Sequence, residues 1–194
     1  MDYKFFFRQI ALIIWSPRKA WNNFSGSGHS AGKTRNNILI PLLLLVGICS
    51  FLGSILYSNV SLHTSYSVFT GIKFFLLDII VVYLSALLFR EITRALDLNA
   101  DFSLSFTIIV YSLIPFFICQ MVSLLFESLA FVNILALYGL WIFWSGSEIM
   151  LNPPVHKKMP MLIAFLVVIA ELYIGSSIAF SSILERIYFG FFAR

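Results

Sequence analysis

Residues 38–57 read ILIPLLLLVGICSFLGSILY and contain no charged side chain. An α-helix rises about 1.5 Å per residue, so a stretch of this length covers the hydrocarbon core of a bilayer, which is about 30 Å thick. Pro41 stands in the first turn of that helix, where a missing N–H costs least. We therefore predict that residues 38–57 cross a membrane as an α-helix.

Four further segments of the chain are long and apolar enough to span a bilayer: residues 68–89, 102–126, 129–151 and 159–184. The whole chain is 60% hydrophobic and 11% charged, whereas soluble domains are about one-quarter charged. The predicted fold class is therefore an all-α polytopic membrane protein, a bundle of five transmembrane helices within residues 37–185. A short aromatic tail, residues 186–194, is expected to lie at the membrane interface.

Proline and glycine positions predict details of this bundle. Pro115 near the centre of the third span predicts a kink. Only residues 127–128 separate the third span from the fourth, which predicts a tight antiparallel hairpin, and Asn152-Pro153-Pro154 should end the fourth helix. Small residues in spans one and five, such as Gly53 and Gly175, predict close contact between helices.

The N-terminal residues 1–36 are predicted to be a cytoplasmic helix and a linker. A helix over residues 5–15 would place Phe6, Phe7, Ile10, Ile13 and Ile14 on one side and Lys4, Arg8 and Ala11 on the other. Such an amphipathic helix is expected to lie in the membrane interface, and the alternative is a helix packed on the bundle. Residues 25–37, rich in Gly, Ser and Asn, predict a flexible linker.

The distribution of basic residues predicts the orientation. Of the thirteen Lys and Arg, six lie before the first span, two after the second and two after the fourth, which puts ten on one side. The positive-inside rule then places the N-terminus in the cytoplasm and the C-terminus outside. Because these residues lie between apolar stretches and form no patch interleaved with aromatics, the net charge of +4 does not indicate nucleic-acid binding.

Asp78 and Glu171 are the acidic residues that fall inside predicted spans at about the same depth. An ionised carboxylate near the bilayer centre costs at least ~2.5 to 3.5 kcal/mol, so both are expected to face the bundle interior. If adjacent, they would share a proton or bind a cation. Alternatively each forms separate hydrogen bonds between helices. Glu148 lies near the cytoplasmic end of span four, where it can reach headgroups or Lys157.

Sequence motifs give no indication of catalysis. Residues 26–34 look like a phosphate-binding loop, but Ser27 stands where a glycine is required, and a membrane span follows. The three histidines fall in polar connections and form no metal-binding motif. We predict no catalytic, cofactor-binding or metal-binding residues. Asn59 begins a glycosylation sequon in the loop after span one, which is read as an ordinary polar loop.

Three short motifs resemble the Yip (Ypt/Rab-interacting protein) domain family, especially its bacterial members. They are Trp15-Ser16-Pro17-Arg18-Lys19-Ala20-Trp21, then Tyr111-Ser112-Leu113-Ile114-Pro115, and Tyr138-Gly139-Leu140-Trp141 with Gly146. The resemblance covers nearly the whole chain and implies five spans with a cytoplasmic N-terminus in a bacterial inner membrane. The Asp-Leu-Tyr-Gly-Pro motif of eukaryotic members, which are linked to Rab GTPases and trafficking, is absent. Tyr111 and Pro115 are the candidate functional residues that the resemblance adds.

These observations predict a non-enzymatic membrane protein that binds lipids, a protein partner or a second copy of itself. A small transporter or channel using Asp78 and Glu171 for a proton or cation is the alternative. An intramembrane lipid enzyme is a third class.

Overall fold

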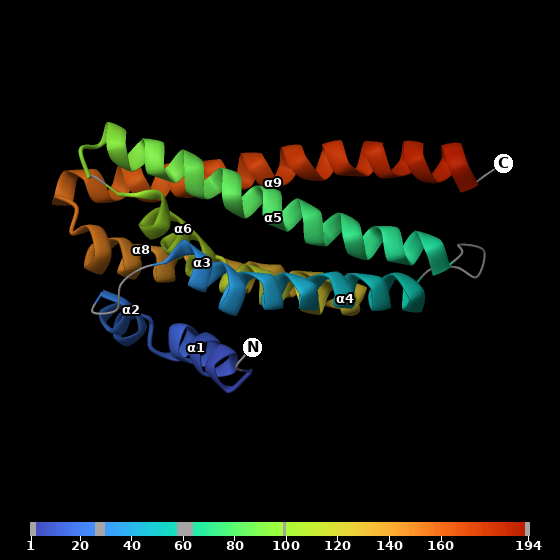
Figure 1. Ribbon diagram of the computed structural model, residues 1–194, viewed down its shortest axis with the longest axis horizontal. Helices are drawn as coiled ribbons and strands as arrows, with labels where there is room; N and C mark the ends of the chain where they lie inside the picture. Colours follow the sequence, from blue (N-terminus) through green and yellow to red (C-terminus); the bar gives the residue numbers. More distant parts are fainter. Residues whose placement is uncertain (1–2, 26–29, 58–63, 99, 193–194) are drawn as a thin grey trace.

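The computed structural model describes residues 3–25, 30–57, 64–98 and 100–192, and every regular element in them is a helix (Figure 1). Four helical stretches are long and apolar enough to cross a membrane, or five if a bent pair counts as one span. The all-helical fold class is therefore confirmed. The predicted sequon at Asn59 lies outside the described residues.

The first predicted span begins earlier than expected. Short helix α3 (Ala31–Thr34), π-helix η1 (Arg35–Leu39) and α4 (Ile40–Tyr57) follow one another without a break. The prediction of a flexible linker over residues 25–37 is therefore wrong for residues 31–37. Pro41 explains the π-helical turn: because proline has no N–H to donate, the hydrogen-bond pattern shifts, and the N–H of Ile40 bonds to the carbonyl of Arg35.

Helix α5 (Thr64–Ala95) is longer than its predicted span of 68–89 at both ends. It packs closely against α4, because a Cβ atom built on Gly71 would lie 2.9 Å from the carbonyl oxygen of Gly47. Only a residue without a side chain allows the two backbones to approach in this way. The predicted close contacts are thus confirmed in α4, where a Cβ on Gly53 would also collide with Leu124.

The third predicted span is broken into α6 (Phe102–Ser112) and α7 (Ile114–Leu125), which meet at a bend of 41°. Asp101 caps the start of α6 by accepting a hydrogen bond of 2.7 Å from the N–H of Leu104. Pro115 stands in the first turn of α7 and cannot donate to the carbonyl of Tyr111, so the helix breaks just before it. The predicted kink is confirmed.

The fourth predicted span starts as a 3₁₀-helical stretch, η2 (Glu127–Leu137), which is kinked at Leu129, and becomes α-helical only in α8 (Tyr138–Leu151). Because η2 packs against α7, the predicted hairpin is confirmed. Asn152 adopts a left-handed conformation with φ of 43°, and Pro153 and Pro154 follow, so α8 ends where the sequence predicts. The 3₁₀ geometry of η2 departs from the regular α-helix predicted over 129–151.

Helix α9 (Val155–Phe192) extends at both ends beyond the predicted span of 159–184. The predicted tail, residues 186–194, is therefore not a separate element, since its first part continues this helix. Gly175 on α9 has open space around it, with no atom within 4 Å of a Cβ built there. The prediction of a close helix contact at Gly175 is wrong.

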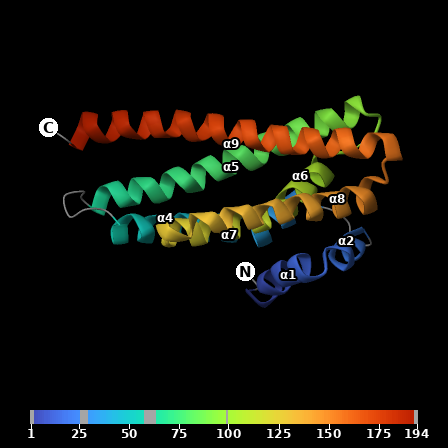
Figure 2. The same cartoon turned by 180° about the vertical axis from the view of Figure 1, so that it is seen from behind.

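The N-terminal segment forms two helices, α1 (Tyr3–Trp15) and α2 (Pro17–Ser25), that lie beside the bundle (Figures 1 and 2). Phe6 and Ile13 of α1 are buried, whereas Phe7 is 63% exposed and does not share their face. This is the arrangement of the alternative prediction, a helix packed on the bundle. A position of α1 at a membrane interface stays a prediction.

The long helices run side by side, and the chain connections gather at two ends (Figures 1 and 2). Helix α2, the connection from α5 to α6 and the connection from α8 to α9 lie at one end. The end of α4, the start of α5 and the C-terminus lie at the other. Helix α2, the end of α5 and the start of α9 bring six basic residues to the first of these ends, which we name the basic end: Arg18, Lys19, Arg90, Arg94, Lys157 and Lys158.

Candidate functional site

The N-terminal segment is anchored to the bundle by a tryptophan. Trp21 of α2 is fully buried, and its Nε1 donates a hydrogen bond of 3.1 Å to the carbonyl oxygen of Ile142 on α8. Its indole occupies the space left by Gly146, because a Cβ there would lie 2.5 Å from Trp21 Cε2. A polar indole N–H that is buried and paired fixes the orientation of α2 on α8.

The three motifs that carry the Yip resemblance meet in space around this tryptophan. The rings of Trp21 and Tyr111 pack edge to face with centroids 5.8 Å apart, and Phe24 lies 4.6 Å from Tyr111. Tyr138 donates a hydrogen bond of 2.8 Å to the carbonyl of Ile14. Trp21 and Phe24 of α2 and Tyr111 of α6 therefore form one aromatic cluster that packs on α8 at Gly146, which the sequence order alone does not reveal.

Tyr111 owes its place to the break between α6 and α7. Pro115 is buried one turn after Tyr111, at the bend of 41° between α6 and α7. Gly139 allows α8 to approach the same break, since a Cβ there would lie 2.5 Å from the carbonyl oxygen of Ser112. Tyr111 thus packs directly against Trp21, and Pro115 lies at the adjacent bend.

Glu148 lies at the basic end and links three segments. Its carboxylate is 2.6 Å from Nζ of Lys158 and 3.9 Å from the guanidinium of Arg18. Lys157, the predicted partner, instead pairs with Asp97 at 3.5 Å. Glu148 therefore connects α8 to α9 and to the N-terminal segment, which supports a structural role for this residue.

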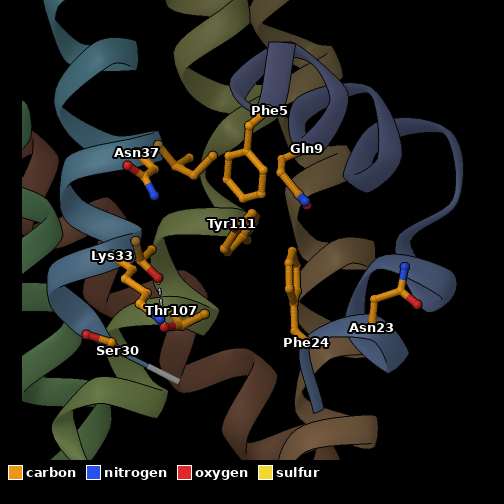
Figure 3. Close-up of a pocket in the computed structure, with 11 residues that line it drawn as sticks. Phe5, Gln9, Asn23, Phe24, Ser30, Lys33, Asn37, Thr107 and Tyr111 are labelled. Atoms are coloured by element: carbon orange, nitrogen blue, oxygen red, sulfur yellow. Dashed lines mark hydrogen bonds between the residues drawn. The ribbon is translucent and has the colours of Figure 1, made fainter. Parts of the chain in front are cut away.

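A pocket of about 370 Å³ lies between the N-terminal helices and the bundle, and Figure 3 shows its walls. We name it the N-terminal pocket. Its lining comes from α1, α2, α3, η1 and α6, together with Ser30, and comprises Phe5, Gln9, Asn23, Phe24, Ser30, Lys33, Thr34, Asn37, Ile38, Thr107 and Tyr111. None of these described lining residues is acidic. The pocket can therefore accept an anion without repulsion from its own wall.

Figure 3 shows aromatic rings between two groups of polar side chains: Phe5, Phe24 and Tyr111 lie between Ser30, Lys33 and Thr107 on one side and Gln9 and Asn23 on the other. Gln9 is 8% exposed, and its Oε1 has no hydrogen-bond partner. The hydroxyl oxygens of Thr34 and Thr107 are 3.3 Å apart, and Thr107 donates to the carbonyl of Ser103 at 2.8 Å. Lys33 is exposed and forms no ion pair with a carboxylate in the described residues, so its ammonium group is available at the pocket.

A second polar site lies inside the bundle, around Asp78. Asp78 is 1% exposed, and neither carboxyl oxygen has a hydrogen-bond partner of ordinary geometry. Gln120 of α7 lies beside it and donates from Nε2 to the hydroxyl of Tyr173 on α9, at 3.4 Å. The prediction that Asp78 faces the bundle interior is confirmed.

Glu171 does not join Asp78 in this cluster. Its side chain is exposed on α9, so the prediction that Glu171 faces the bundle interior is wrong in the described chain. The two residues 171 and 173 are about 200° apart around a helix, which explains why Tyr173 faces inward and Glu171 does not. The structure gives no contact between Asp78 and Glu171, and hence no carboxylate pair.

No protein-family model, curated protein or solved structure matches the chain. The Yip resemblance therefore stays a prediction carried by its three motifs. The structure brings the three motifs together around Trp21 and Tyr111.

Sequence reasoning missed two residues that the structure places at these sites. Gln9 is the polar residue that interrupts the apolar face of α1, and it points into the N-terminal pocket (Figure 3). Gln120 is an amide in the middle of an otherwise apolar segment. In both cases the available signal was an uncharged polar residue among apolar neighbours, which is weaker than a charge but still calls for a partner.

Proposed function

We propose that this chain is a non-enzymatic integral membrane protein that binds the headgroup of an anionic phospholipid in its N-terminal pocket. The observation that carries the proposal is the pocket itself, which combines an available lysine, a buried amide oxygen without a hydrogen-bond partner and, among its described lining residues, no acidic side chain. In this reading the protein is Yip-like, and it acts in membrane organisation by holding lipids or a partner at one leaflet.

The chemistry of the wall favours a phosphate ester over other anions. A lysine ammonium supplies a point charge to phosphate oxygens. The unpartnered Oε1 of Gln9 needs a donor, which a hydroxyl or amine of a headgroup supplies. Phe5, Phe24 and Ile38 offer an apolar wall to the glycerol backbone and the upper acyl chain.

The proposed orientation in the membrane is based on the position of the basic end. We propose that the end holding α2 and the connections after α5 and α8 faces the cytoplasm of a bacterial cell, at its inner membrane. The N-terminal pocket would then open at the cytoplasmic leaflet, where anionic lipids attract Lys and Arg. Arg18 and Lys19 of α2, Lys33 of α3 and Arg35 of η1 are exposed, and at the end of α5 Arg94 is exposed and Arg90 is partly exposed.

A transporter or channel built on a pair of carboxylates is less well supported. It requires Asp78 and Glu171 to act together, and one of them is buried while the other is exposed on α9. Binding of a protein partner or a second copy of the chain stays a prediction.

The test is lipid binding by the purified chain in nanodiscs. Native mass spectrometry would count bound phosphatidylglycerol against phosphatidylcholine for the wild type, Lys33→Gln and Arg35→Gln. Both variants lose one positive charge two residues apart, but only Lys33 lines the pocket. We expect Lys33→Gln to weaken phosphatidylglycerol binding about three- to tenfold, which corresponds to the loss of one partly exposed charged contact.

Arg35→Gln is expected to change binding less than twofold, because its guanidinium bonds to Asn36 and not to the pocket. An equal loss of phosphatidylglycerol binding in both variants would mean that binding depends only on the net charge of the protein. That result, or equal retention of phosphatidylcholine and phosphatidylglycerol by the wild type, would reject the proposed site.

A further inference from the structure

The polar cluster around Asp78 has more hydrogen-bond acceptors than donors. Asp78 is 1% exposed and Gln120 is 5% exposed, so water does not reach them freely. Both carboxyl oxygens of Asp78 and Oε1 of Gln120 are without partners, and one N–H of Gln120 Nε2 donates to the hydroxyl oxygen of Tyr173. Together with the second N–H of Gln120 and the hydroxyl hydrogen of Tyr173, the three side chains hold three hydrogens for four acceptor oxygens. Buried acceptors without donors are costly, so the cluster lacks a hydrogen.

No positive group in the described residues compensates Asp78. Helices α4, α6 and α7 contain no charged residue; their titratable groups are Cys49, Tyr111 and Cys119, together with Tyr57 at the end of α4. On α5 itself, Lys73 donates at 2.7 Å to Ser181 of α9, more than one turn away from Asp78.

In its described part, α9 offers no cation to Asp78 either. Lys157 and Lys158 lie at the basic end, where they pair with Asp97 and Glu148. Glu171 is exposed, and Tyr173 is the titratable side chain of α9 that lies near Asp78. The carboxyl group of Asp78 is therefore surrounded by apolar and neutral polar groups.

We propose that Asp78, Gln120 and Tyr173 form a proton-binding site that holds α9 against α5 and α7. A carboxyl group becomes a hydrogen-bond donor only when it carries a proton. A proton taken from water onto one oxygen of Asp78 can be donated to Oε1 of Gln120, and Nε2 of Gln120 continues to Tyr173. One bound proton thus completes a chain of hydrogen bonds across three helices.

A metal cation fits the cluster less well than a proton does. The side chains offer two carboxyl oxygens, one amide oxygen and one phenol oxygen, whereas hard cations such as Ca²⁺ take about six to eight oxygen ligands. The surrounding helices have their backbone carbonyls engaged in helical hydrogen bonds. We therefore assign a proton, and not a metal ion, to this site.

Loss of the proton from Asp78 is expected to change the position of α9. Apart from this cluster, the described contacts that fix α9 include the stacked rings of Phe143 and Phe165, 3.9 Å apart, and the bond from Lys73 to Ser181. When Asp78 loses its proton, an ionised carboxylate remains out of water, and repacking of α9 admits water to it. The middle of α9 is then expected to move away from α5 as the pH rises.

Infrared spectroscopy of the full chain in nanodiscs tests the proton directly. At neutral pH we expect a carbonyl band of a protonated acid that disappears in Asp78→Asn and stays in Glu171→Gln. In Gln120→Leu the band should shift to higher frequency, because the acid loses its acceptor. The proposal is overturned if Asp78→Asn removes no protonated-acid band at neutral pH.

Isotope labelling assigns the infrared band in the wild-type chain, so the assignment does not depend on whether Asp78→Asn folds. The chain has four aspartates, Asp2, Asp78, Asp97 and Asp101, and the side chain of Asp97 is 91% exposed. Because Asp101 is exposed as well, a protonated band that moves with ¹³C-aspartate at neutral pH belongs to a buried aspartate. Its absence from the labelled wild type would also reject the site.

Distances between spin labels test the movement of α9. Labels at Ile72 on α5 and Ile178 on α9, both exposed, are placed in a chain without Cys49 and Cys119. We expect the distance to change with pH in the wild type and to stay constant in Asp78→Asn, which keeps a hydrogen donor at all pH values. A distance that responds to added sodium at fixed pH, or to pH equally in both chains, contradicts proton binding.

Discussion

The indole of Trp21 lies against Gly146, so closely that a Cβ on that glycine would be 2.5 Å from the ring. Trp21 belongs to the N-terminal segment and Gly146 to α8, in the middle of the bundle's apolar sequence. The contact, together with the hydrogen bond from Trp21 to Ile142, fixes the wall of the N-terminal pocket on the bundle. Docking of α2 is therefore sensitive to the size of a single residue.

Gly146→Val is expected to displace α2 from α8. Overpacking of this kind costs about 1 to 3 kcal/mol, and the indole ring cannot move without losing its hydrogen bond to Ile142. Accessibility of a cysteine at Ala20, which is fully buried, measures the displacement by thiol labelling. We expect labelling at least tenfold faster in Gly146→Val than in the chain with Gly146.

Gly175→Val is the matched control, because a Cβ on Gly175 meets no atom within 4 Å. Labelling at position 20 should be unchanged in this variant. Equal acceleration in both variants would show that the substitution of a helical glycine, and not contact with Trp21, disturbs the segment.

Glu148→Gln is expected to weaken the connection between α8, α9 and the N-terminal segment only slightly. Exposed and partly exposed ion pairs contribute about 0 to 1 kcal/mol and are screened by salt. Thermal unfolding at low and high salt should show a small loss of stability at low salt that disappears at high salt. A loss above about 2 kcal/mol that salt does not reduce would contradict a surface role.

Glu91→Gln provides the comparison for Glu148→Gln. Glu91 pairs with Arg90 and Arg94 on its own helix, at 2.6 and 3.0 Å, so it joins no separate segments. Thiol labelling at position 20 should rise slightly in Glu148→Gln and stay constant in Glu91→Gln.

The apolar segments of the sequence predicted most of the bundle, because the need to bury about 20 residues in lipid leaves a clear pattern. Helix ends were predicted less well. Residues 31–37 have a linker-like composition, yet they are helical because α3 is held to α6 by the bond from the N–H of Ala31 to Ser103. Residues 127–137 form a 3₁₀-helix, a geometry that hydropathy does not distinguish from an α-helix.

The candidate sites were predicted in part. The charge on Asp78 indicated a buried polar group. Whether Glu171 faces inward is decided by the rotation of α9 about its axis. That rotation depends on side-chain packing, which the sequence pattern does not specify. Gln9 and Gln120 carry no charge and were overlooked. Their importance comes from neighbours distant in sequence, such as Thr107 and Tyr173.

Gln9→Leu should affect stability and lipid binding in opposite directions. Removing a buried acceptor without a partner relieves a cost of about 1 to 3 kcal/mol, so thiol labelling at position 20 should slow. Affinity for phosphatidylglycerol in nanodiscs should fall, because the headgroup loses an acceptor. Asn22→Leu, an exposed substitution on α2, should change neither quantity. A parallel fall in docking and affinity would mean that Gln9 serves the fold and not the ligand.

Pro115→Ala is expected to reduce the bend of 41° between α6 and α7. Alanine restores an N–H that can donate to the carbonyl of Tyr111, so the two helices can join into one. Spin labels at Asp101 and Phe126, both exposed, lie at the outer ends of the pair. Straightening would lengthen their separation by about 2 Å, given a rise of about 1.5 Å per residue.

The same substitution should reach the N-terminal pocket, because Tyr111 lies one turn before the proline and lines that pocket. We expect Pro115→Ala to lower phosphatidylglycerol binding together with the change in bend, while Lys33 and Gln9 remain present. An unchanged separation would show that the bend is imposed from outside, by the close approach of Gly139 to Ser112. In that case Gly139→Ala, and not Pro115→Ala, should move Tyr111 and reduce lipid binding, since the added Cβ would press on the carbonyl of Ser112.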